Sequence, residues 1–396
     1  MVKLTKNLDG IVPDPVRYWL KVGKDAGATN NLTIGVPDPM PKESLEAFAK
    51  AQYDAELKGA TGYPNFDGEE TMKKAILSVE ANFGAKMTDE DLSRIYVTIG
   101  ASQALQFVFS LFPSGSELIV TTPCWGTIHN MAAHSGVKGV PAALFEKGKF
   151  IPENAKNAVS KKSAAVYINF PANPTGEIVP EAELRKMCDW AVSADLQIIT
   201  DEPYKYLIFN QRKTPYTSPI NFSEDVAAKT NLISSFSKIV KPDIRIGYVR
   251  LSPEILAADD MVGFYFRNLS AGAPRGVQAG VSALVEKDPT LRFLRPIVDG
   301  YRKKSEIAAK YMTEWGCKLP YMPAATYMMF PTTPHGEDGE EFVRKTAVEK
   351  KTAFIPGTSF GGGFKGFEPL KKHFRIGYGA GMSPEKLEEV MAGLIR

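Results

Sequence analysis

The segment Ser234-Ser235-Phe236-Ser237-Lys238 places a lysine directly behind small hydroxyl residues. The apolar run Asn231-Leu232-Ile233 precedes it, and Arg245 follows shortly afterwards. A lysine attacks a carbonyl group only when burial or a neighbouring cation lowers the pKa of its amine. Hydroxyls beside an arginine suit a phosphate. The alternative is a solvated lysine at a strand end, and only motifs elsewhere can overturn it, because the chain has 48 Lys and Arg residues.

The length and charge of the chain favour an ordinary two-domain globular protein. At 396 residues it exceeds the size that one hydrophobic core usually supports. Its 44% hydrophobic and 23% charged residues are typical of soluble proteins. Lys and Arg number 48 against 45 Asp and Glu, and this net charge of only +3 predicts no nucleic-acid partner.

The cysteines, the histidines and the first residues carry no sign of a disulfide framework, a metal site or a targeting segment. Three cysteines are too few and too widely spaced for either kind of site, and the four histidines lack metal-ligand spacing. Residues 1–19 lack the apolar core of about 7–15 residues that a signal peptide needs. No segment approaches the ~20 apolar residues of a membrane span. We therefore expect a cytoplasmic protein without metal or membrane contacts.

Short apolar segments alternate with helical segments through the middle of the chain. Strands are expected at 94–99, 117–121, 164–170, 196–201 and 230–234, and helices at 100–112, 126–134 and 181–194. This alternation indicates an α/β fold in which helices cover both faces of a mostly parallel sheet. Beyond residue 292, a long helix (296–315), short strand-rich segments and a closing helix from Ser383 indicate a smaller α+β unit.

The residues best suited to chemistry collect at the carboxyl ends of the predicted strands, where parallel sheets bind ligands. These ends are Gly100–Gln103, Pro123–Trp125, Pro171–Gly176, Asp201–Tyr204 and Ser235–Lys238. A pyridoxal 5′-phosphate site needs an amine, an anion for the pyridinium nitrogen, donors for the phenolic oxygen, a stacking face and a phosphate pocket. The strand ends supply a residue for each of these needs. The phosphate pocket would be the start of the helix at Gly100, which offers free backbone N–H groups to a phosphate.

These motifs make the chain similar to the fold type I pyridoxal-phosphate aminotransferases of class I/II, the superfamily of aspartate aminotransferase. The resemblance runs from about Leu32 to the C-terminus and rests on motifs that occur in the family's order. They are Asn173-Pro174-Thr175-Gly176, Asp201-x-Pro203-Tyr204, Ser235-Phe236-Ser237-Lys238 and the late Arg375. The resemblance implies a large cofactor-binding domain (46–290) and a small discontinuous domain built from both chain ends (1–45 and 291–396).

The resemblance implies three catalytic residues. Lys238 would be the Schiff-base lysine and would move the proton between the substrate Cα and the cofactor C4′. Asp201 would pair with the pyridine N–H and keep the ring protonated, so its removal should damage catalysis more than binding. Tyr204, together with Asn173, would hydrogen-bond the phenolic oxygen and tune the pKa of the imine.

The same resemblance assigns the remaining cofactor and substrate contacts. Trp125 would stack on the ring, and the phosphate cup would consist of Ala101, Ser102, Gln103, Ser235 and Arg245. Arg375 would bind the substrate α-carboxylate as a bidentate pair. Asn173 would also contact the substrate, and Gly35 would lie in the segment that closes over it. Tyr63 would reach a phosphate in the partner subunit, which implies a homodimer with shared active sites.

Two details depart from the family pattern. Arg245 follows Lys238 by seven residues, one fewer than usual, which makes its phosphate contact less secure. The Leu-Arg pair that usually follows the tyrosine loop is Met72-Lys73 in this chain. Neither departure touches the central chemistry.

The implied reaction is ping-pong transamination between an L-amino acid and a 2-oxo acid. The same cofactor and fold also serve racemases, C–S lyases and side-chain cyclases, and the fold occurs as a non-catalytic ligand-sensing module. The choice of substrate stays open. Arg267 and Arg275 are candidates for binding a second carboxylate, whereas the aromatic segment 264–266 would suit an apolar donor.

Overall fold

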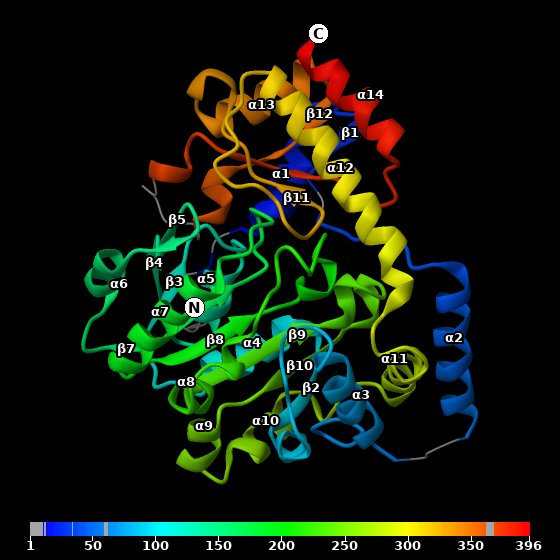
Figure 1. The fold of residues 1–396 in the computed structure, drawn as a ribbon, viewed down its shortest axis with the longest axis vertical. Helices are drawn as coiled ribbons and strands as arrows, with labels where there is room; N and C mark the ends of the chain where they lie inside the picture. Colours follow the sequence, from blue (N-terminus) through cyan, green and yellow to red (C-terminus); the bar gives the residue numbers. More distant parts are fainter. Residues whose placement is uncertain (1–10, 12, 34, 59–61, 362–367) are drawn as a thin grey trace, which may run out of the picture.

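A seven-stranded sheet forms the centre of the computed structural model, which describes residues 11, 13–33, 35–58, 62–361 and 368–396 (Figure 1). In spatial order the strands are β2 (Ile95–Ile99), β10 (Ile246–Arg250), β9 (Thr230–Ser235), β8 (Gln197–Asp201), β7 (Ser163–Asn169), β3 (Glu117–Thr121) and β4 (Lys138–Ala142). β10 is antiparallel to both neighbours, and the other pairs are parallel. The predicted mostly parallel sheet is confirmed.

Helices bury both faces of this sheet. Successive side chains of each strand point to opposite faces, so neighbouring residues belong to different cores. In β7, Tyr167 belongs to the apolar core that α4 (Gly100–Ser110) covers. Its neighbour Val166 belongs to the core on the other face, where α7 (Glu181–Ser193) packs. α3 (Glu70–Glu80) covers β9 and β10 on that second face. Burial on both faces explains why the predicted strands are continuous apolar runs.

The remaining elements around the sheet are short, apart from two helices that pack against each other. They are α2 (Lys42–Leu57), α5 (Ile128–His134), β5 (Phe145–Glu146), β6 (Lys149–Phe150), α6 (Pro152–Ala158), α8 (Glu224–Lys229), α9 (Pro253–Ala258), α10 (Val262–Ser270) and α11 (Arg275–Lys287). Figure 1 shows α2 on the outer side of the molecule beside α11. Gly276 and Gly280 of α11 let the two helices approach, because a Cβ at Gly280 would lie 2.7 Å from the ring of Phe48.

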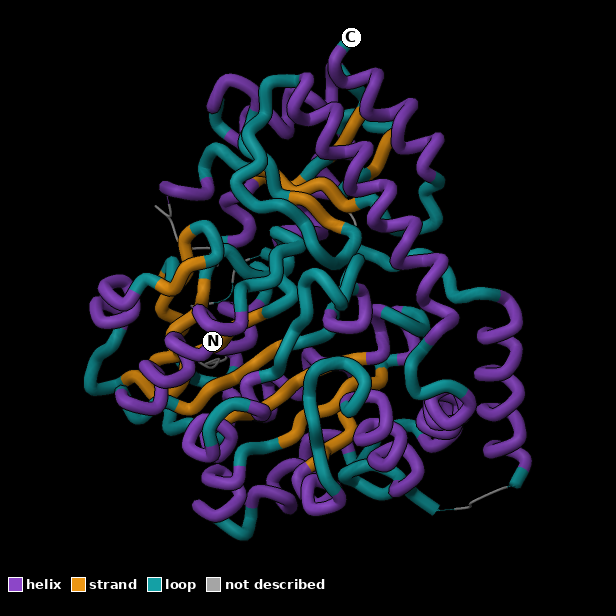
Figure 2. The backbone as a smooth tube through the Cα atoms, viewed as in Figure 1, coloured by secondary structure: helices purple, strands orange, loops and turns teal. Residues whose placement is uncertain are grey.

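A second group of short strands and helices, formed by segments from the beginning and the end of the described chain, lies beside the central sheet (Figures 1 and 2). β1 (Asn30–Asn31) pairs with β12 (Thr352–Ala353), and β14 (Phe374–Gly377) lies between β11 (Met328–Met329) and β13 (Ile355–Pro356). The helices of this part are α1 (Pro15–Asp25), α12 (Arg295–Glu314), α13 (Gly339–Glu349) and α14 (Pro384–Ile395). The domain boundaries stay predictions: 45/46 falls inside α2, and 290/291 falls shortly before α12. Within the described ranges, no helix is both long and apolar enough to cross a membrane.

The topology brings one end of each of the seven strands to the same edge of the sheet. β2, β3, β4, β7, β8 and β9 run in the same direction, so their carboxyl ends meet there. β10 runs the opposite way and therefore begins at that edge, with Arg245 immediately before its first residue. The edge thus collects the segments that the sequence predicted as chemically active.

Candidate active site

A cavity of about 350 Å³ lies at this edge of the sheet. Most residues that the sequence assigned to the site line its wall: Gly35, Ala101, Ser102, Trp125, Asn173, Asp201, Tyr204, Ser235, Lys238, Arg245 and Arg375. They come from the sheet edge and, in the case of Gly35 and Arg375, from the part of the fold that contains both chain ends. The cavity therefore lies where these two parts of the fold meet.

One wall of the cavity is a cup of hydroxyl and backbone N–H groups at the N-terminal end of α4. The helix begins directly after β2, and Ala101 and Ser102 line the cavity. Gly100 has a φ of +72°, and a Cβ there would lie 2.2 Å from Nη2 of Arg245, so glycine leaves room for the guanidinium. Nη1 of Arg245 donates to Oγ of Ser237 at 3.3 Å. This combination suits a phosphate group.

Arg245 reaches the cavity despite the short spacing from Lys238. Its backbone is left-handed, with φ 52° and ψ 43°, a conformation that costs energy for a residue with a side chain. Nη2 also donates to the main-chain carbonyl of Ile99 at 3.3 Å. The hydrogen bonds to Ser237 and Ile99 hold the guanidinium in place, although the backbone of Arg245 is strained.

Asp201 lies buried at the end of β8, and only one of its carboxylate oxygens has a partner. The hydroxyl of Tyr167 donates to Oδ2 at 2.8 Å, whereas Oδ1 has no hydrogen-bond partner in the described part of the chain. Burial raises the pKa of Asp201 to about 7, although Tyr167 and Lys238 act in the opposite direction. A buried carboxylate with an unsatisfied oxygen at a cavity calls for an N–H donor, preferably a cationic one. A pyridinium N–H meets that need.

The amine of Lys238 lies beside the aromatic ring of Tyr204. Lys238 ends the short turn that follows β9, and its Nζ lies 5.7 Å from the centre of the Tyr204 ring. Tyr204 is buried and packs edge-on against Tyr327, with 6.0 Å between ring centres. Among the described residues, Nζ of Lys238 has no hydrogen-bond or ion-pair partner. The amine is therefore available to a carbonyl compound in the cavity.

Arg375, on β14, is a fully buried guanidinium at the cavity wall. Nη1 donates to Oδ1 of Asn173 at 3.0 Å, and Nη2 donates to the main-chain carbonyl of Thr33 at 2.6 Å. Its Nε–H has no partner in the described residues. Burial lowers the pKa of Arg375 to about 10, although Tyr204 opposes this shift. The group stays cationic near neutral pH, and N–H groups remain for a carboxylate.

A family model described as aminotransferase class I and II matches residues 29–394. The chain belongs to this family. It is 26% identical to the aspartate aminotransferase of Pyrococcus abyssi, over 98% of this chain and 96% of that protein. It is 30% identical to the (5-formylfuran-3-yl)methyl phosphate transaminase of Methanocaldococcus jannaschii, over 93% and 91%. The solved Thermus thermophilus aspartate aminotransferase with maleate shares the fold, with a TM-score of 0.83, 23% identity and full coverage of both chains.

The family match confirms the predicted fold type I aminotransferase of class I/II. Amino-group transfer is the family's activity, and the racemase, lyase, cyclase and ligand-sensing alternatives are not favoured. Enzymes of this family use pyridoxal phosphate as cofactor. The roles of individual residues in this aminotransferase depend on the geometry of the cavity.

Two residues that the resemblance placed in the site do not line the cavity. Oε1 of Gln103 accepts a hydrogen bond from the N–H of Ile99 at 2.7 Å, so this side chain supports the turn between β2 and α4. Tyr63 is 89% exposed. Its carbonyl accepts a hydrogen bond from Arg275 at 2.8 Å, and Arg275 also pairs with Glu69. Arg275 therefore holds the Tyr63 loop, and neither Arg275 nor Arg267 lines this cavity.

The cavity wall of this aminotransferase also contains residues to which the sequence assigned no role. Pro203 and Ser237 lie inside the quoted motifs, whereas Asp14, Val16 and Arg17 at the start of α1, Val36 and Asn169 lie outside them. Asn169 donates from Nδ2 to the carbonyl of Asp201 at 2.7 Å and accepts from the N–H of Asn173 at 2.9 Å, so it ties two assigned segments together. Its position at a strand end could have identified Asn169, whereas no motif marks residues 14–17.

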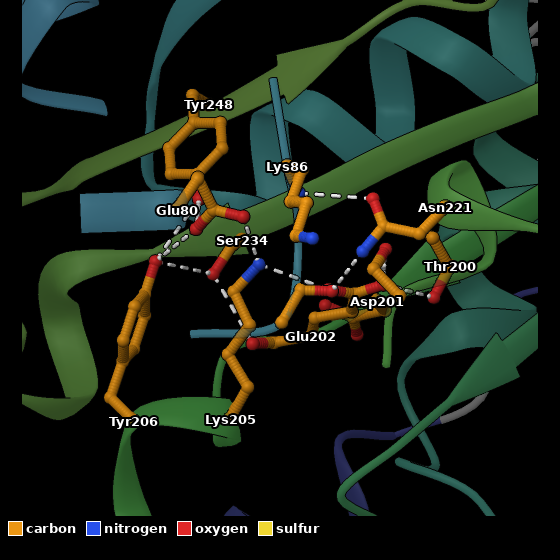
Figure 3. Close-up of polar contacts among 12 residues, drawn as sticks. Glu80, Lys86, Thr200, Asp201, Glu202, Lys205, Tyr206, Asn221, Ser234 and Tyr248 are labelled. Carbon is orange, nitrogen blue, oxygen red and sulfur yellow. Dashed lines mark hydrogen bonds and ion pairs between the residues drawn. The ribbon is translucent and has the colours of Figure 1, made fainter. Parts of the chain in front are cut away.

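A fully buried group of charged side chains lies behind Asp201 (Figure 3). Nζ of Lys205 pairs with Glu80 of α3 and, at 2.9 Å, with Glu202. The hydroxyls of Tyr206 and Tyr248 both donate to Glu80, the former at 2.7 Å. Burial raises the pKa of Glu80, and the charge of Lys205 opposes this shift. Glu80 and Lys205 are thus joined by a charge-assisted network inside the protein.

This buried network fixes the segment that carries two assigned catalytic residues. Asp201 immediately precedes Glu202, and Tyr204 immediately precedes Lys205. Oε1 of Glu202 also accepts hydrogen bonds from the hydroxyls of Thr200 and Ser218. Because the segment is anchored to α3 from behind, Asp201 and Tyr204 are held in position at the cavity wall.

The raised pKa of Asp201 predicts how the stability of the cofactor-free protein depends on pH. The carboxyl keeps its proton up to about pH 7 when folded, but releases it near pH 3.9 when unfolded. Stability is therefore lost as pH rises between these values. Asp201→Asn removes this titration, so the Tm of the wild type relative to this variant should fall by a few degrees from pH 4.5 to pH 8. Scanning calorimetry measures the Tm of both proteins. A Tm difference that does not change with pH would contradict the raised pKa of Asp201.

Proposed function

We propose that this aminotransferase binds pyridoxal 5′-phosphate in the 350 Å³ cavity and transfers an amino group between an L-amino acid and a 2-oxo acid in two half-reactions. The observation that carries the proposal is the unsatisfied Oδ1 of buried Asp201, in a cavity that also holds the Lys238 amine and the Arg245 cup. When bound, the cofactor supplies an aldehyde and a ring that accepts the electrons of the broken bond.

Different wall residues would hold different parts of the cofactor. Oδ1 of Asp201 would accept the N–H of the pyridine ring and keep it protonated, and Tyr204 with Asn173 would donate to the phenolic oxygen. The phosphate would occupy the cup formed by Ala101, Ser102, Ser235 and Arg245. Trp125 would cover one face of the ring, and Gln103 would support the cup from behind.

Lys238 and Arg375 would act on the substrate itself. Nζ of Lys238 would take the proton from the substrate Cα and return it during amino transfer. Arg375 would bind the α-carboxylate, with Asn173 beside it. A Cβ at Gly35 would lie 3.8 Å from both Nη atoms of Arg375, an ordinary van der Waals distance, so this residue lies directly beside the guanidinium. Every L-amino acid and 2-oxo acid carries this carboxylate, so Arg375 would serve all substrates.

We also propose a homodimer in which Tyr63 reaches the phosphate of the partner subunit. Support comes from the 89% exposure of Tyr63 and from exposed apolar side chains on α2 and α10, among them Leu57 and Phe264. Light scattering should give a mass twice that of one chain. The cytoplasm stays the proposed compartment, and the three free, buried cysteines suit its reducing conditions.

The reaction type is tested by adding an amino donor without any 2-oxo acid. A transaminase loaded with cofactor should convert one equivalent of donor, shift its near-ultraviolet or visible absorbance once, and stop. A 2-oxo acid should then restore the first spectrum. Continued turnover of the donor alone would instead indicate a racemase or a lyase, and failure to take up the cofactor would overturn the proposal.

A further inference from the structure

Among the described residues, four cationic side chains line the active-site cavity, and the proposed function uses three of them. Lys238 serves as the reacting amine, Arg245 as the phosphate ligand and Arg375 as the ligand of the α-carboxylate. The fourth is Arg17, in the first turn of α1. Asp14 and Asp201 are the carboxylates on the described wall, and Asp201 is committed to the cofactor.

The side chain of Arg17 has no partner that would explain its position. In the described ranges, its guanidinium forms no hydrogen bond or ion pair, and the residue is exposed. Asp14 forms no ion pair with this guanidinium: one oxygen accepts the main-chain N–H of Arg17 at 2.7 Å as the helix cap, and the other accepts from Thr127 at 3.3 Å. A cation in the first turn also opposes the helix dipole, so helix stability does not account for Arg17.

The start of α1 lies next to the proposed α-carboxylate site. Burial lowers the pKa of Arg375, and the carboxylate of Asp14 is close enough to act in the opposite direction. Val16 and Val36 line the same cavity and offer apolar contacts. A substrate held by Arg375 thus shares one cavity with apolar contacts for side-chain methylenes and with the guanidinium of Arg17, which has no ion-pair partner in the described part of the chain.

We propose that Arg17 is a specificity-determining residue that selects substrates whose side chain ends in an anion, as in aspartate or glutamate. The inference rests on the proposed function, because it assumes that Arg375 holds the α-carboxylate. The planar guanidinium binds a carboxylate through paired hydrogen bonds, which an uncharged side chain cannot accept in the same way.

Binding of two unreactive acids tests the inference without turnover. Succinate and butyrate have the same number of carbon atoms, but only succinate carries a second carboxylate. The cofactor-loaded wild type should bind succinate about 10-fold more tightly than butyrate, as measured by absorbance titration or thermal shift. Arg17→Met should abolish this preference, and Arg17→Lys should retain part of it. Lys21→Met is the matched control, because Lys21 lies one turn further along α1, pairs with Asp25 and does not line the cavity.

A donor panel separates failure of this inference from failure of the proposed function. With aspartate, glutamate, phosphoserine, leucine and phenylalanine as donors, Arg17→Met should lower kcat/KM about 10-fold for the anionic donors and leave leucine and phenylalanine unchanged. Phosphoserine shows whether the site takes a phosphate in place of a carboxylate. An equal effect on all donors, or none on succinate binding, overturns the role of Arg17 alone. If no donor is converted by the wild type, the proposed function itself fails.

Discussion

Replacing Lys238 by alanine is expected to lower kcat by roughly 10²- to 10⁴-fold, the range that a positioned acid–base group contributes. Nζ of Lys238 lies at the cavity wall beside Tyr204 and has no competing partner in the described residues. Its removal leaves the proposed proton transfer at the substrate Cα without a protein base. A single-turnover measurement of the donor half-reaction should show the full loss, because it isolates this step.

Three further variants show whether the loss belongs to the chemistry of the amine. Lys238→Arg keeps the charge but should be as slow, because a guanidinium does not give up its proton in proteins. A small amine added to Lys238→Ala should restore part of the rate. Lys241→Ala should be unaffected, because Lys241 lies three residues further on and pairs with Asp243 at the surface. Wild-type turnover by Lys238→Ala would refute the assignment.

The central fold followed from the sequence where local pattern and burial agree. The strand predicted at 117–121 is observed with the same bounds as β3. The strand predicted at 164–170 differs from β7 by one residue at each end, and the strand predicted at 196–201 differs from β8 by one residue at its start. These strands are apolar because both faces are buried. β4 was not predicted, since its sequence contains Gly139 and Pro141. β4 is the outermost strand of the sheet, with a neighbour on one side only, and a proline is tolerated in such a strand.

β10 was not predicted for another reason. It follows two short turns, and its pairing with β2 joins segments far apart in the sequence. Local periodicity carries no information about such a pairing. The antiparallel direction of β10 is nevertheless what brings Arg245 to the cavity, so the sequence pointed to this arginine only through its nearness to Lys238 and through the family resemblance.

Some residues of the candidate site could likewise be predicted from the sequence, and others could not. Asp201 and Lys238 were predictable, because they follow strands whose carboxyl ends meet at one edge. Arg17 was not, because residues 14–17 reach the cavity only through packing of α1 in the part of the fold that joins both chain ends. Gln103 shows the opposite case: it lies in the right segment, but its side chain turns back to the N–H of Ile99. Position along a strand end therefore predicts proximity better than it predicts side-chain direction.

Arg375→Met is expected to lower kcat/KM by roughly 10²- to 10³-fold for every donor, since removing one partner of a buried charged pair costs about 2–5 kcal/mol. Arg375 offers unpaired N–H groups at the cavity wall and stays cationic despite its burial. Arg375→Lys should lie between the wild type and Arg375→Met, because an ammonium keeps the charge but loses the paired geometry. The dependence of the donor half-reaction on donor concentration measures the effect.

The cofactor absorbance shows whether the Arg375 variants retain an intact site, which matters because Asn173 and the carbonyl of Thr33 lose a donor in Arg375→Met. If the half-reaction of Arg375→Met saturates at the same donor concentration as that of the wild type, Arg375 does not bind the α-carboxylate. The pattern across donors is the sharper test. Arg375 would bind the group that all substrates share, so its loss should weaken aspartate and leucine by similar factors. Arg17 would bind only the side-chain anion, so the two arginines should differ in selectivity even where their effects on aspartate are similar in size.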